Sequence, residues 1–560
     1  MPSEVFEDGE NLQIGLLEAE FLRSDGRPAH AASMPFPRLK PLGQSEMRTF
    51  RTLILENQFL RVTILPGLGG RILSLFDKRT QTEILRRHAE LTPIIGGLRG
   101  VTLREGIQFR LNHEDRVNSL GNVDSQLDFP LDEESAAGVW LAESSVNLGF
   151  GFHLHLSLPA DRAALQIEVR VHNRLLEPLP YAPELSIYVG GGACEAPGVW
   201  FDTDRQVGLL ALGHPEPIRY SVLTEGHWRL QRFAQSQSMG GRVLDAFTWT
   251  LVPISGLPGV SGAALDGAIH LEPNRLIVQA TRPSLGAKVV IRTGDGQTLE
   301  APIDLYPERL LDLPLELGSD AVEAVILDAN KGELLRSAFE APRALDPRFE
   351  TFGPTPRAVG HTHRAEAALR HKAFATANQE LEQALLYNGE DHLAWWAKAM
   401  ALRLMGDAEG ERPELLNAHF LAPLDPVLRA ESFLSTSPSM GKEPSAIVAA
   451  LLECPENLIE VACQLLEWGL YDQAQRWIDE SLRHRDLAML RYLLAFAYLS
   501  ASRMTVEAAE QVRAAGTLGD GPPYPWRAIE RTALLLLANQ FPDDVGVRRM
   551  LGIVSLHEHE

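Results

Sequence analysis

The sequence predicts a multidomain chain in which an all-β part comes first and an all-α part follows. Up to about residue 350 it carries short apolar alternations typical of strands, broken every 8–15 residues by Gly, Pro, Asn or Asp. From about residue 357 the hydrophobic period changes from two residues to 3.6, the period of a helix. Glycine follows the same division, because 34 of the 45 glycines lie in the first 356 residues.

The composition is that of a globular protein with an acidic surface. The 560 residues include 74 acidic and 52 basic side chains, which gives a formal charge of −22. Duplex DNA and anionic membranes both reward patches of Lys and Arg, so we expect neither a nucleic-acid nor a membrane partner. Three cysteines without a CxxC motif are too few for a disulfide framework.

The start of the chain and its apolar runs indicate a cytoplasmic protein. Residues 1–11 are acidic and lack the basic start and apolar core of a secretory signal. The longest apolar runs have seven residues, far short of the ~20 that span a bilayer.

The β-part is predicted to form two domains. Alternating runs such as 59–65 and 164–171 continue without a long amphipathic helix, which is typical of a sandwich or barrel. We therefore set residues 1–49 apart as an N-terminal extension and place a large β-domain at 50–256.

A cluster of Gly, Pro and Ser around 255–262 separates this domain from a second one. Residues 263–342 carry six or seven short strands, the size and rhythm of a small immunoglobulin-like β-sandwich. The proline-studded stretch 343–356 is expected to be a linker.

The helical part, 357–560, contains an internal repeat. Ala377, Leu381, Ala384 and Gly389 have spacings of 4, 3 and 5 residues, and the same spacings return from Ala474 and again, 34 residues later, from Ala508. Small residues at these places let paired helices touch, so the segment resembles a tetratricopeptide array, an α-solenoid. The alternative is a plain helical bundle, and residues 426–454 fit the repeat poorly. The resemblance implies a protein partner held by the repeats.

Familiar catalytic motifs are absent from the sequence. It has no GxSxG elbow, HExxH, Rossmann GxGxxG or Walker A motif. His153 and His155 would share one strand face, either as a metal half-site or as two histidines beside a cleft. No third ligand is identifiable, so we expect no metal and no cofactor.

One stretch of the β-part carries a family resemblance. Residues 56–79, ENQFLRVTILPGLGGRILSLFDKR, resemble the opening of galactose-mutarotase-like proteins, where a glycine turn leads into a strand beginning Gly-Arg-Ile. More closely, the chain resembles an uncharacterised bacterial family in which such a β-supersandwich precedes a small sandwich and tetratricopeptide repeats. The resemblance continues, in the same order, through the blocks 98–100, 104–109, 123–124, 249–256 and 276–287.

The resemblance implies a broad concave sheet that holds a sugar. In mutarotases a glutamate removes the anomeric hydroxyl proton while a histidine protonates the ring oxygen. Relatives have a glutamate where this chain has Gln108, and Arg229 stands where we would place the base. His113 matches the first histidine and the second has no counterpart. The β-domain is also shorter than the family's, so the cleft is expected to be degenerate.

Two functions follow from these observations. The favoured one is a carbohydrate-recognition or scaffold protein that binds a neutral or acidic saccharide and a protein partner. The alternative is a carbohydrate-active enzyme, an aldose epimerase or glycoside-processing protein, using His113 and a nearby carboxylate such as Glu184. Enzyme activity is left open, with a non-catalytic role favoured.

The residues expected to line the sugar site are polar or aromatic. Arg71 is the expected anchor, since a guanidinium forks onto adjacent hydroxyls; a structural arginine that binds loop carbonyls is the alternative. Trp228 is expected to stack on a sugar, with a place in the core as its alternative. The complete expected set is Arg71, Arg104, Gln108, Asn112, His113 and Trp228.

Overall fold

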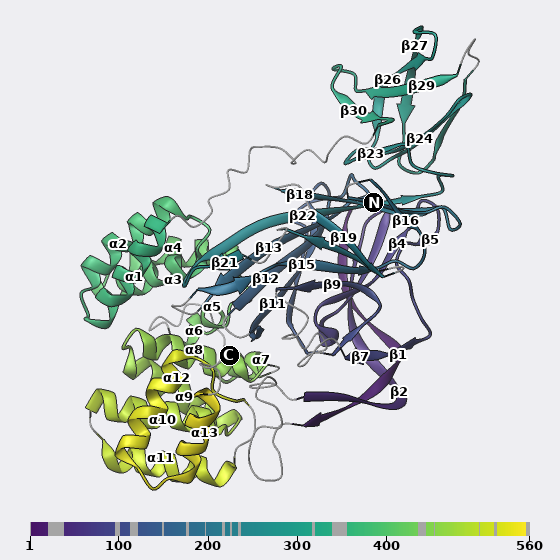
Figure 1. The fold of residues 1–560 in the computed structure, drawn as a ribbon. Helices are drawn as coiled ribbons and strands as arrows, with labels where there is room; N and C mark the ends of the chain where they lie inside the picture. The colour runs from purple at the N-terminus through teal and green to yellow at the C-terminus, as the bar shows by residue number, and fades with distance from the viewer. Residues whose placement is uncertain are drawn as a thin grey trace.

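The structure is a computed structural model (Figure 1). It describes residues 2–555 except 21–37, 96–100, 112–120, 148–149, 175–177, 197, 215–218, 225–226, 233–236, 316–319, 339–355, 435–443, 453, 503 and 520–522. The linker predicted at 343–356 lies outside the described residues, apart from residue 356, which begins the first helix.

A ten-stranded sheet forms one layer of the large β-domain. Its strand order is β19-β20-β15-β9-β4-β3-β2-β1-β6, with β5 paired to β4. In chain order the strands are β1 (Glu4–Glu20), β2 (Arg38–Glu56), β3 (Leu60–Leu65), β4 (Arg71–Asp77), β5 (Thr82–Glu83), β6 (Glu90–Leu91), β9 (Gly106–Arg110), β15 (Glu184–Tyr188), β19 (Arg219–Thr224) and β20 (His227–Gln231).

An eight-stranded antiparallel sheet forms the second layer. Its order is β10-β11-β12-β13-β22-β18-β17-β16. The strands are β10 (Asp124–Asp128), β11 (Ala137–Asn147), β12 (Phe150–Leu158), β13 (Leu165–Asn173), β16 (Ala193–Ala196), β17 (Val199–Asp202), β18 (Val207–His214) and β22 (Leu244–Ser255). Apolar side chains from both sheets form one buried core between them, so the layers pack as a sandwich. Two short pairs, β7 (Pro93–Ile95) with β8 (Val101–Leu103) and β14 (Leu179–Tyr181) with β21 (Gln237–Met239), complete the domain.

Residues 1–49, set apart by sequence as an extension, contribute to the large sheet. β1 pairs with β2 from Glu4 opposite Glu56 to Glu20 opposite Arg38, and β2 continues into the pairing with β3. The boundary expected at residue 50 therefore falls inside β2. The β1–β2 pair has polar residues on both faces over much of its length. It therefore lacks the alternation of apolar and polar residues that marks a half-buried strand.

A small sandwich follows, as the sequence predicts. Its two four-stranded sheets have the orders β23-β24-β25-β28 and β27-β26-β29-β30 and share a separate apolar core. The strands are β23 (Gly262–Ala264), β24 (Gly267–Glu272), β25 (Arg275–Ala280), β26 (Ser284–Thr293), β27 (Thr298–Leu305), β28 (Leu311–Pro314), β29 (Ala321–Leu327) and β30 (Glu333–Arg336).

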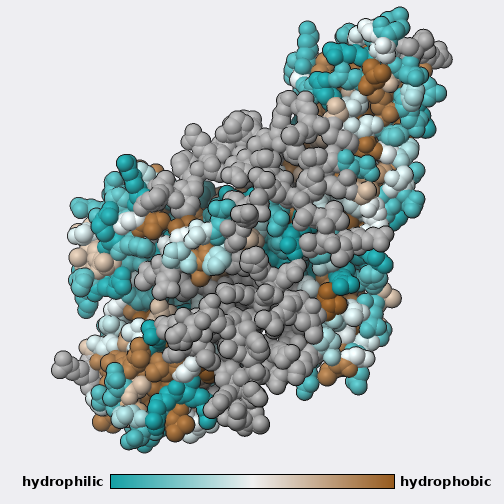
Figure 2. Space-filling view, in the orientation of Figure 1, coloured by the Kyte–Doolittle hydropathy of each residue, from teal (hydrophilic) through white to brown (hydrophobic). Residues whose placement is uncertain are grey.

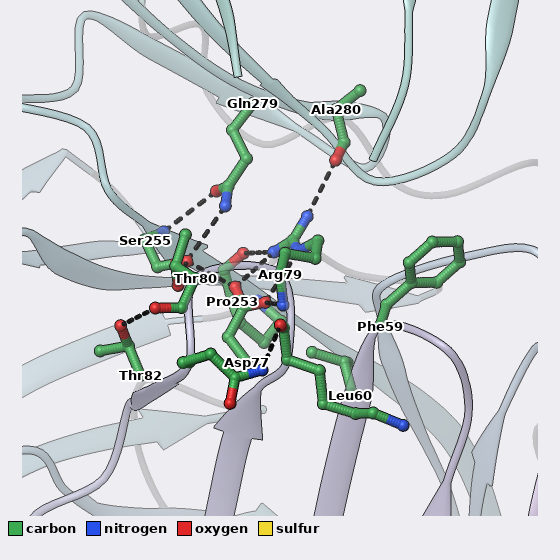
Figure 3. A network of polar contacts seen from close by, with 12 residues as sticks. Phe59, Leu60, Asp77, Arg79, Thr80, Thr82, Pro253, Ser255, Gln279 and Ala280 are labelled. Atoms are coloured by element: carbon green, nitrogen blue, oxygen red, sulfur yellow. Dashed lines mark hydrogen bonds and ion pairs between the residues drawn. The ribbon is translucent and has the colours of Figure 1, made fainter. Parts of the chain in front are cut away.

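A buried polar network joins the two sandwiches (Figure 3). Arg79, just after β4, pairs with Asp77 at 2.7 Å and donates to the carbonyls of Pro253 and Ala280, at 3.0 and 2.8 Å. The hydroxyl of Ser255 donates to Asp77, and its backbone N–H donates to the side chain of Gln279. Arg79 thus links the end of the large domain to a strand of the small one.

Paired helices occupy the chain from residue 356 onwards. They are α1 (Pro356–Arg370), α2 (Phe374–Tyr387), α3 (His392–Met405), α4 (Ala408–Leu421), α5 (Pro426–Arg429), α6 (Glu431–Leu434), α7 (Pro444–Leu451), α8 (Glu456–Glu467), α9 (Tyr471–His484), α10 (Ala488–Ser502), α11 (Thr505–Leu518), α12 (Ala528–Gln540) and α13 (Val545–Ser555). The repeat residues Ala377, Ala474 and Ala508 are fully buried between helices, as their small size predicts. Among the described helices, none is both long and apolar enough to cross a bilayer.

Charged side chains connect the helical array to the eight-stranded sheet. Arg174, which follows β13, pairs with Glu460 of α8 at 2.7 Å. Arg242, in the turn before β22, pairs with Glu366 of α1 and Glu467 of α8. These contacts hold the array against the side of the large domain where β12 and β13 run (Figure 1).

Histidines within this interface predict a pH-dependent stability. His153 and His172 lie on the sheet, with ring centroids 5.4 and 6.0 Å from that of His392. Burial, reinforced by His392 and Arg174, lowers the pKa of His153 to about 3 and lowers that of His172 as well. A histidine in the unfolded chain binds a proton near pH 6.5, whereas these two stay neutral in the fold. Lowering the pH below about 6.5 therefore favours the unfolded state.

Urea unfolding at pH 7.5 and pH 5.0 checks this expectation. The wild type should lose stability at pH 5.0, and His153→Gln should lose less because one of the two buried titrating groups is gone. An equal loss in both proteins would contradict the role given to His153.

Candidate functional site

The candidate site is the outer face of the ten-stranded sheet, defined here as the side of β9, β15 and β20 opposite the sandwich core. Successive side chains of a strand point to opposite sides. Ile107, Leu185 and Trp228 belong to the core, so the residues alternating with them point outward. These outward residues are polar: Gln108, Arg110, Glu184, Ser186, Tyr188, His227, Arg229 and Gln231.

Strand register brings the outward residues into rows. Ser186 stands opposite Gln108 on one side and Arg229 on the other. Glu184 stands between Arg110 and Gln231 in the next row. Directly opposite residues lie about 5 Å apart, close enough for their side chains to interact. Gln108 and Arg229, the two residues expected to stand where relatives have glutamates, therefore share one row.

Glu184 is engaged by arginine on both sides. Its Oε2 lies 3.1 Å from Nε of Arg229, and its Oε1 lies 3.7 Å from Nη1 of Arg110. The residue is only 6% exposed. Within β9, β15 and β20 it is the only carboxylate, so the carboxyl group available on this part of the face is already compensated by positive charge.

Arg71 is placed inside the protein, where its side chain binds the chain itself. It is 0% exposed, and its Nη1 donates to the carbonyl oxygens of Leu103, at 3.3 Å, and Glu105. Its Nη2 donates to Oε1 of Gln108 at 2.6 Å. Burial lowers the pKa of Arg71 to about 10. This arrangement differs from the expected sugar anchor and corresponds to the structural arginine that was its alternative.

The other expected site residues are distributed between the face, the core and the undescribed part of the chain. Gln108 lies on the outer face, is 2% exposed, and accepts a second hydrogen bond from Oγ1 of Thr102 at 3.1 Å. Arg104 is exposed in the turn between β8 and β9. Trp228 is 1% exposed and points into the core, which differs from the expected sugar contact because strand alternation turns it away from the face. Asn112 and His113 lie outside the described residues.

The structure adds two residue pairs that the sequence did not suggest. The rings of Tyr188 and His227 stack on the outer face, with centroids 4.2 Å apart. The ring of His88 hydrogen-bonds to the carboxylate of Glu105, which also accepts from the His88 backbone N–H at 3.2 Å. Both pairs join segments that are far apart in the sequence, so no local spacing signals them.

Gly106 explains how β9 reaches this position. Its φ is +67°, and a Cβ added there would lie 2.2 Å from the carbonyl oxygen of Ile72. Only glycine allows this close approach of β9 to β4 without moving the backbone. The approach places Gln108 beside Arg71.

The described residues include no group of three or more His, Cys, Asp or Glu side chains arranged to hold a metal ion. His153 and His155, considered as a half-site, have different surroundings. His153 faces His392 of the array, whereas His155 stacks on Trp140 and bonds to Asp128 at 2.9 Å.

Comparisons with known proteins give structural neighbours of two kinds. No protein-family model matches the chain. A solved TPR-domain containing protein from Parabacteroides distasonis is similar over 97% of this chain and 96% of its own, with 12% identity and a TM-score of 0.30. A putative aldose 1-epimerase from Escherichia coli K12 matches 36% of this chain and 98% of its own, with 13% identity and a TM-score of 0.25. A galactose mutarotase-like protein from Clostridium acetobutylicum matches 37% and 96%, with 10% identity and a TM-score of 0.26.

These neighbours are of the two kinds that the sequence resembles. A tetratricopeptide protein covers nearly the whole chain, and galactose-mutarotase-like proteins cover its N-terminal part. The architecture itself is established by the sheets and helices described above, a β-sandwich followed by a smaller sandwich and a helical array.

Proposed function

We propose that the protein recognises a saccharide on the outer face of its large β-sandwich, without turning it over, and holds a protein partner on its helical array. The observation that carries the first part is the pairing of Glu184 with Arg110 and Arg229. General acid–base chemistry needs a group free to take a proton within hydrogen-bond reach of the substrate. A carboxylate held between two guanidiniums is poorly suited to that role.

The residues around Glu184 support recognition. The amide of Gln108 cannot accept a proton at neutral pH, yet amides, hydroxyls and guanidiniums hydrogen-bond readily to sugar hydroxyls. The half-buried Arg229 supplies such a group on the same row, and the stacked Tyr188 and His227 add aromatic surface beside it. The face is thus chemically suited to bind a polar ring.

The helical array supports the second part of the proposal through its exposed apolar surface. Figure 2 shows hydrophobic side chains gathered over the block of helices α10–α13. The exposed apolar residues of this block include Leu518, Leu535, Leu536 and Val545, which are 38–62% exposed. Exposed apolar patches are a feature of protein–protein contact sites, so these residues support a partner on this block.

The alternative, a carbohydrate-active enzyme, is favoured by one observation. His88 is half exposed and hydrogen-bonds to the buried carboxylate of Glu105. A histidine oriented by a carboxylate is an arrangement that general acid–base catalysis uses. His113, the expected catalytic histidine, would have to supply the second group.

A glycan array combined with a mutarotation assay tests the proposal. We expect retention of at least one saccharide and anomer interconversion no faster than in buffer, because each missing acid or base typically costs 10²–10⁴-fold. Glu184→Gln should leave the assay unchanged. Rapid interconversion that is lost in His113→Ala or His88→Ala would establish the enzyme instead.

A further inference from the structure

A separate hollow lies on the outer face near the other edge of the ten-stranded sheet. It has a volume of about 380 Å³, within the usual range for small-molecule sites. Strands β1 to β5 form it, away from the row of Gln108 and Arg229. Its lining residues are Asp8, Gly9, Glu10, Thr52, Ile54, Arg61, Thr63, Ser74, Phe76, Glu83 and Arg87.

The floor of the hollow presents unengaged hydroxyl groups. Thr52 of β2 and Thr63 of β3 are 1% and 8% exposed. Within the described part of the chain, neither threonine hydroxyl has a hydrogen-bond partner. Each hydroxyl can donate one hydrogen bond and accept two. Because these hydroxyls are not among the buried polar atoms that lack partners, they face the open space of the hollow, where a ligand that brings its own hydroxyls can bind them.

The wall beside the threonines is fixed by Glu83. The hydroxyl of Ser74, directly opposite Thr63 on β4, donates to this carboxylate. The backbone N–H groups of Leu75 and Leu85 donate to its other oxygen at 3.0 and 3.1 Å. Glu83 is therefore held in one orientation before any ligand arrives, which reduces the entropy cost of binding.

Next to Glu83, the lining combines an aromatic ring with a guanidinium. Phe76 of β4 is half buried and stands opposite Arg61 of β3 in the strand register. An aromatic ring offers an apolar surface to the C–H face of a sugar, and a guanidinium offers a fork to neighbouring hydroxyls. Arg87, on the rim, is paired with Glu10.

The charge of the hollow selects against acidic ligands. Its lining contains the carboxylates of Asp8, Glu10 and Glu83 and the guanidiniums of Arg61 and Arg87. This local excess of negative charge adds to the overall charge of −22. An anionic sugar would be repelled both by the charge of the lining and by the charge of the whole protein, whereas a neutral sugar would not.

We propose that this hollow is a second binding site, specific for a neutral saccharide. The inference rests on the proposed carbohydrate recognition but assigns it to different residues, with Thr52 and Thr63 as hydrogen-bonding groups on the floor and Phe76 as the apolar platform. The protein thereby contacts carbohydrate at two places on one sheet face.

Titration of the full chain with glucose, galactose, maltose and lactose tests the inference, with glucuronate as the acidic comparison. The variant Thr52→Val/Thr63→Val removes both hydroxyls while keeping side-chain shape and β-propensity, so the fold should persist. Two lost hydrogen bonds predict affinity for the neutral sugars reduced roughly 10- to 100-fold. Arg61→Met, at an exposed position, should also weaken binding without affecting the thermal melt.

Thr298→Val is the matched control, because Thr298 is an exposed strand threonine of the small sandwich. It should bind like the wild type. If the wild type binds a neutral sugar and both hollow variants bind it equally well, the second site is refuted while the proposed function stands. If the wild type binds none of these neutral sugars, the second site is refuted, and the proposed function is refuted with it only if the glycan array also retains no saccharide. Tighter binding of glucuronate than of glucose would overturn the assigned ligand class.

Discussion

Replacing Arg79 with methionine is expected to lower the free energy of unfolding by about 3–5 kcal/mol. The side chains of Arg79 and Asp77 are 2% and 0% exposed, so the substitution leaves a carboxylate buried without its main partner. It also removes the donors to the carbonyl oxygens of Pro253 and Ala280. Because those carbonyls belong to different sandwiches, the substitution should also weaken the contact between the two sandwiches that Figure 3 shows. Urea unfolding followed by circular dichroism measures the change.

Two further variants test whether the loss of stability comes from the buried Arg79–Asp77 ion pair. Arg275→Met removes an ion pair with Asp312 whose side chains are 44% and 51% exposed, and it should leave the urea midpoint close to that of the wild type because solvent screens the pair. Asp77→Asn combined with Arg79→Met removes the stranded charge and should recover part of the loss. An Arg79→Met protein as stable as Arg275→Met would show that the junction does not depend on this pair.

The sequence predicted the architecture well where secondary structure has a clear period. The alternating runs 59–65 and 164–171 became β3 and β13, and the small residues of the helical repeat became buried contacts. Period and composition are local properties, so one sequence is enough to show them. The β1–β2 ribbon was not predicted as part of the sheet because its two faces are both largely polar.

The candidate site was predicted less completely, since side-chain direction depends on neighbours distant in sequence. The chemistry of Arg71 and Trp228 indicates a sugar site, but the end of β8 and the turn before β9 bury the first, and strand alternation buries the second. The sequence indicates Glu184 only as a carboxylate that could act with His113. Its two arginine partners come from β9 and β20, and this follows only from the strand register. The sequence likewise does not show that Thr52 and Thr63 line one hollow, because this depends on the pairing of β2 with β3.

The array is expected to depend on Arg242 for its docking against the large sandwich. Arg242 is 7% exposed and has a φ of +59°, a left-handed conformation that is uncommon for a residue with a Cβ. From this turn its guanidinium reaches Glu366 of α1 at 3.4 Å and Glu467 of α8. A single side chain of the sandwich thus holds two helices that lie about 100 residues apart in the sequence.

Arg242→Met should destabilise the protein by about 3–5 kcal/mol, because it leaves two carboxylates facing each other in a buried interface. Burial already raises the pKa of Glu467, and loss of its cation should raise it further. The free energy of unfolding of the variant should therefore be lowest at alkaline pH, where both carboxylates are charged. Adding Glu366→Gln and Glu467→Gln should restore much of the stability and remove that pH dependence.

Urea unfolding at pH 6 and pH 8.5, with the exposed Arg483→Met as control, measures both effects. A wild-type midpoint in Arg242→Met at both pH values would show that the array is held by its other contacts, with Arg174 and its partner Glu460 as the principal ones.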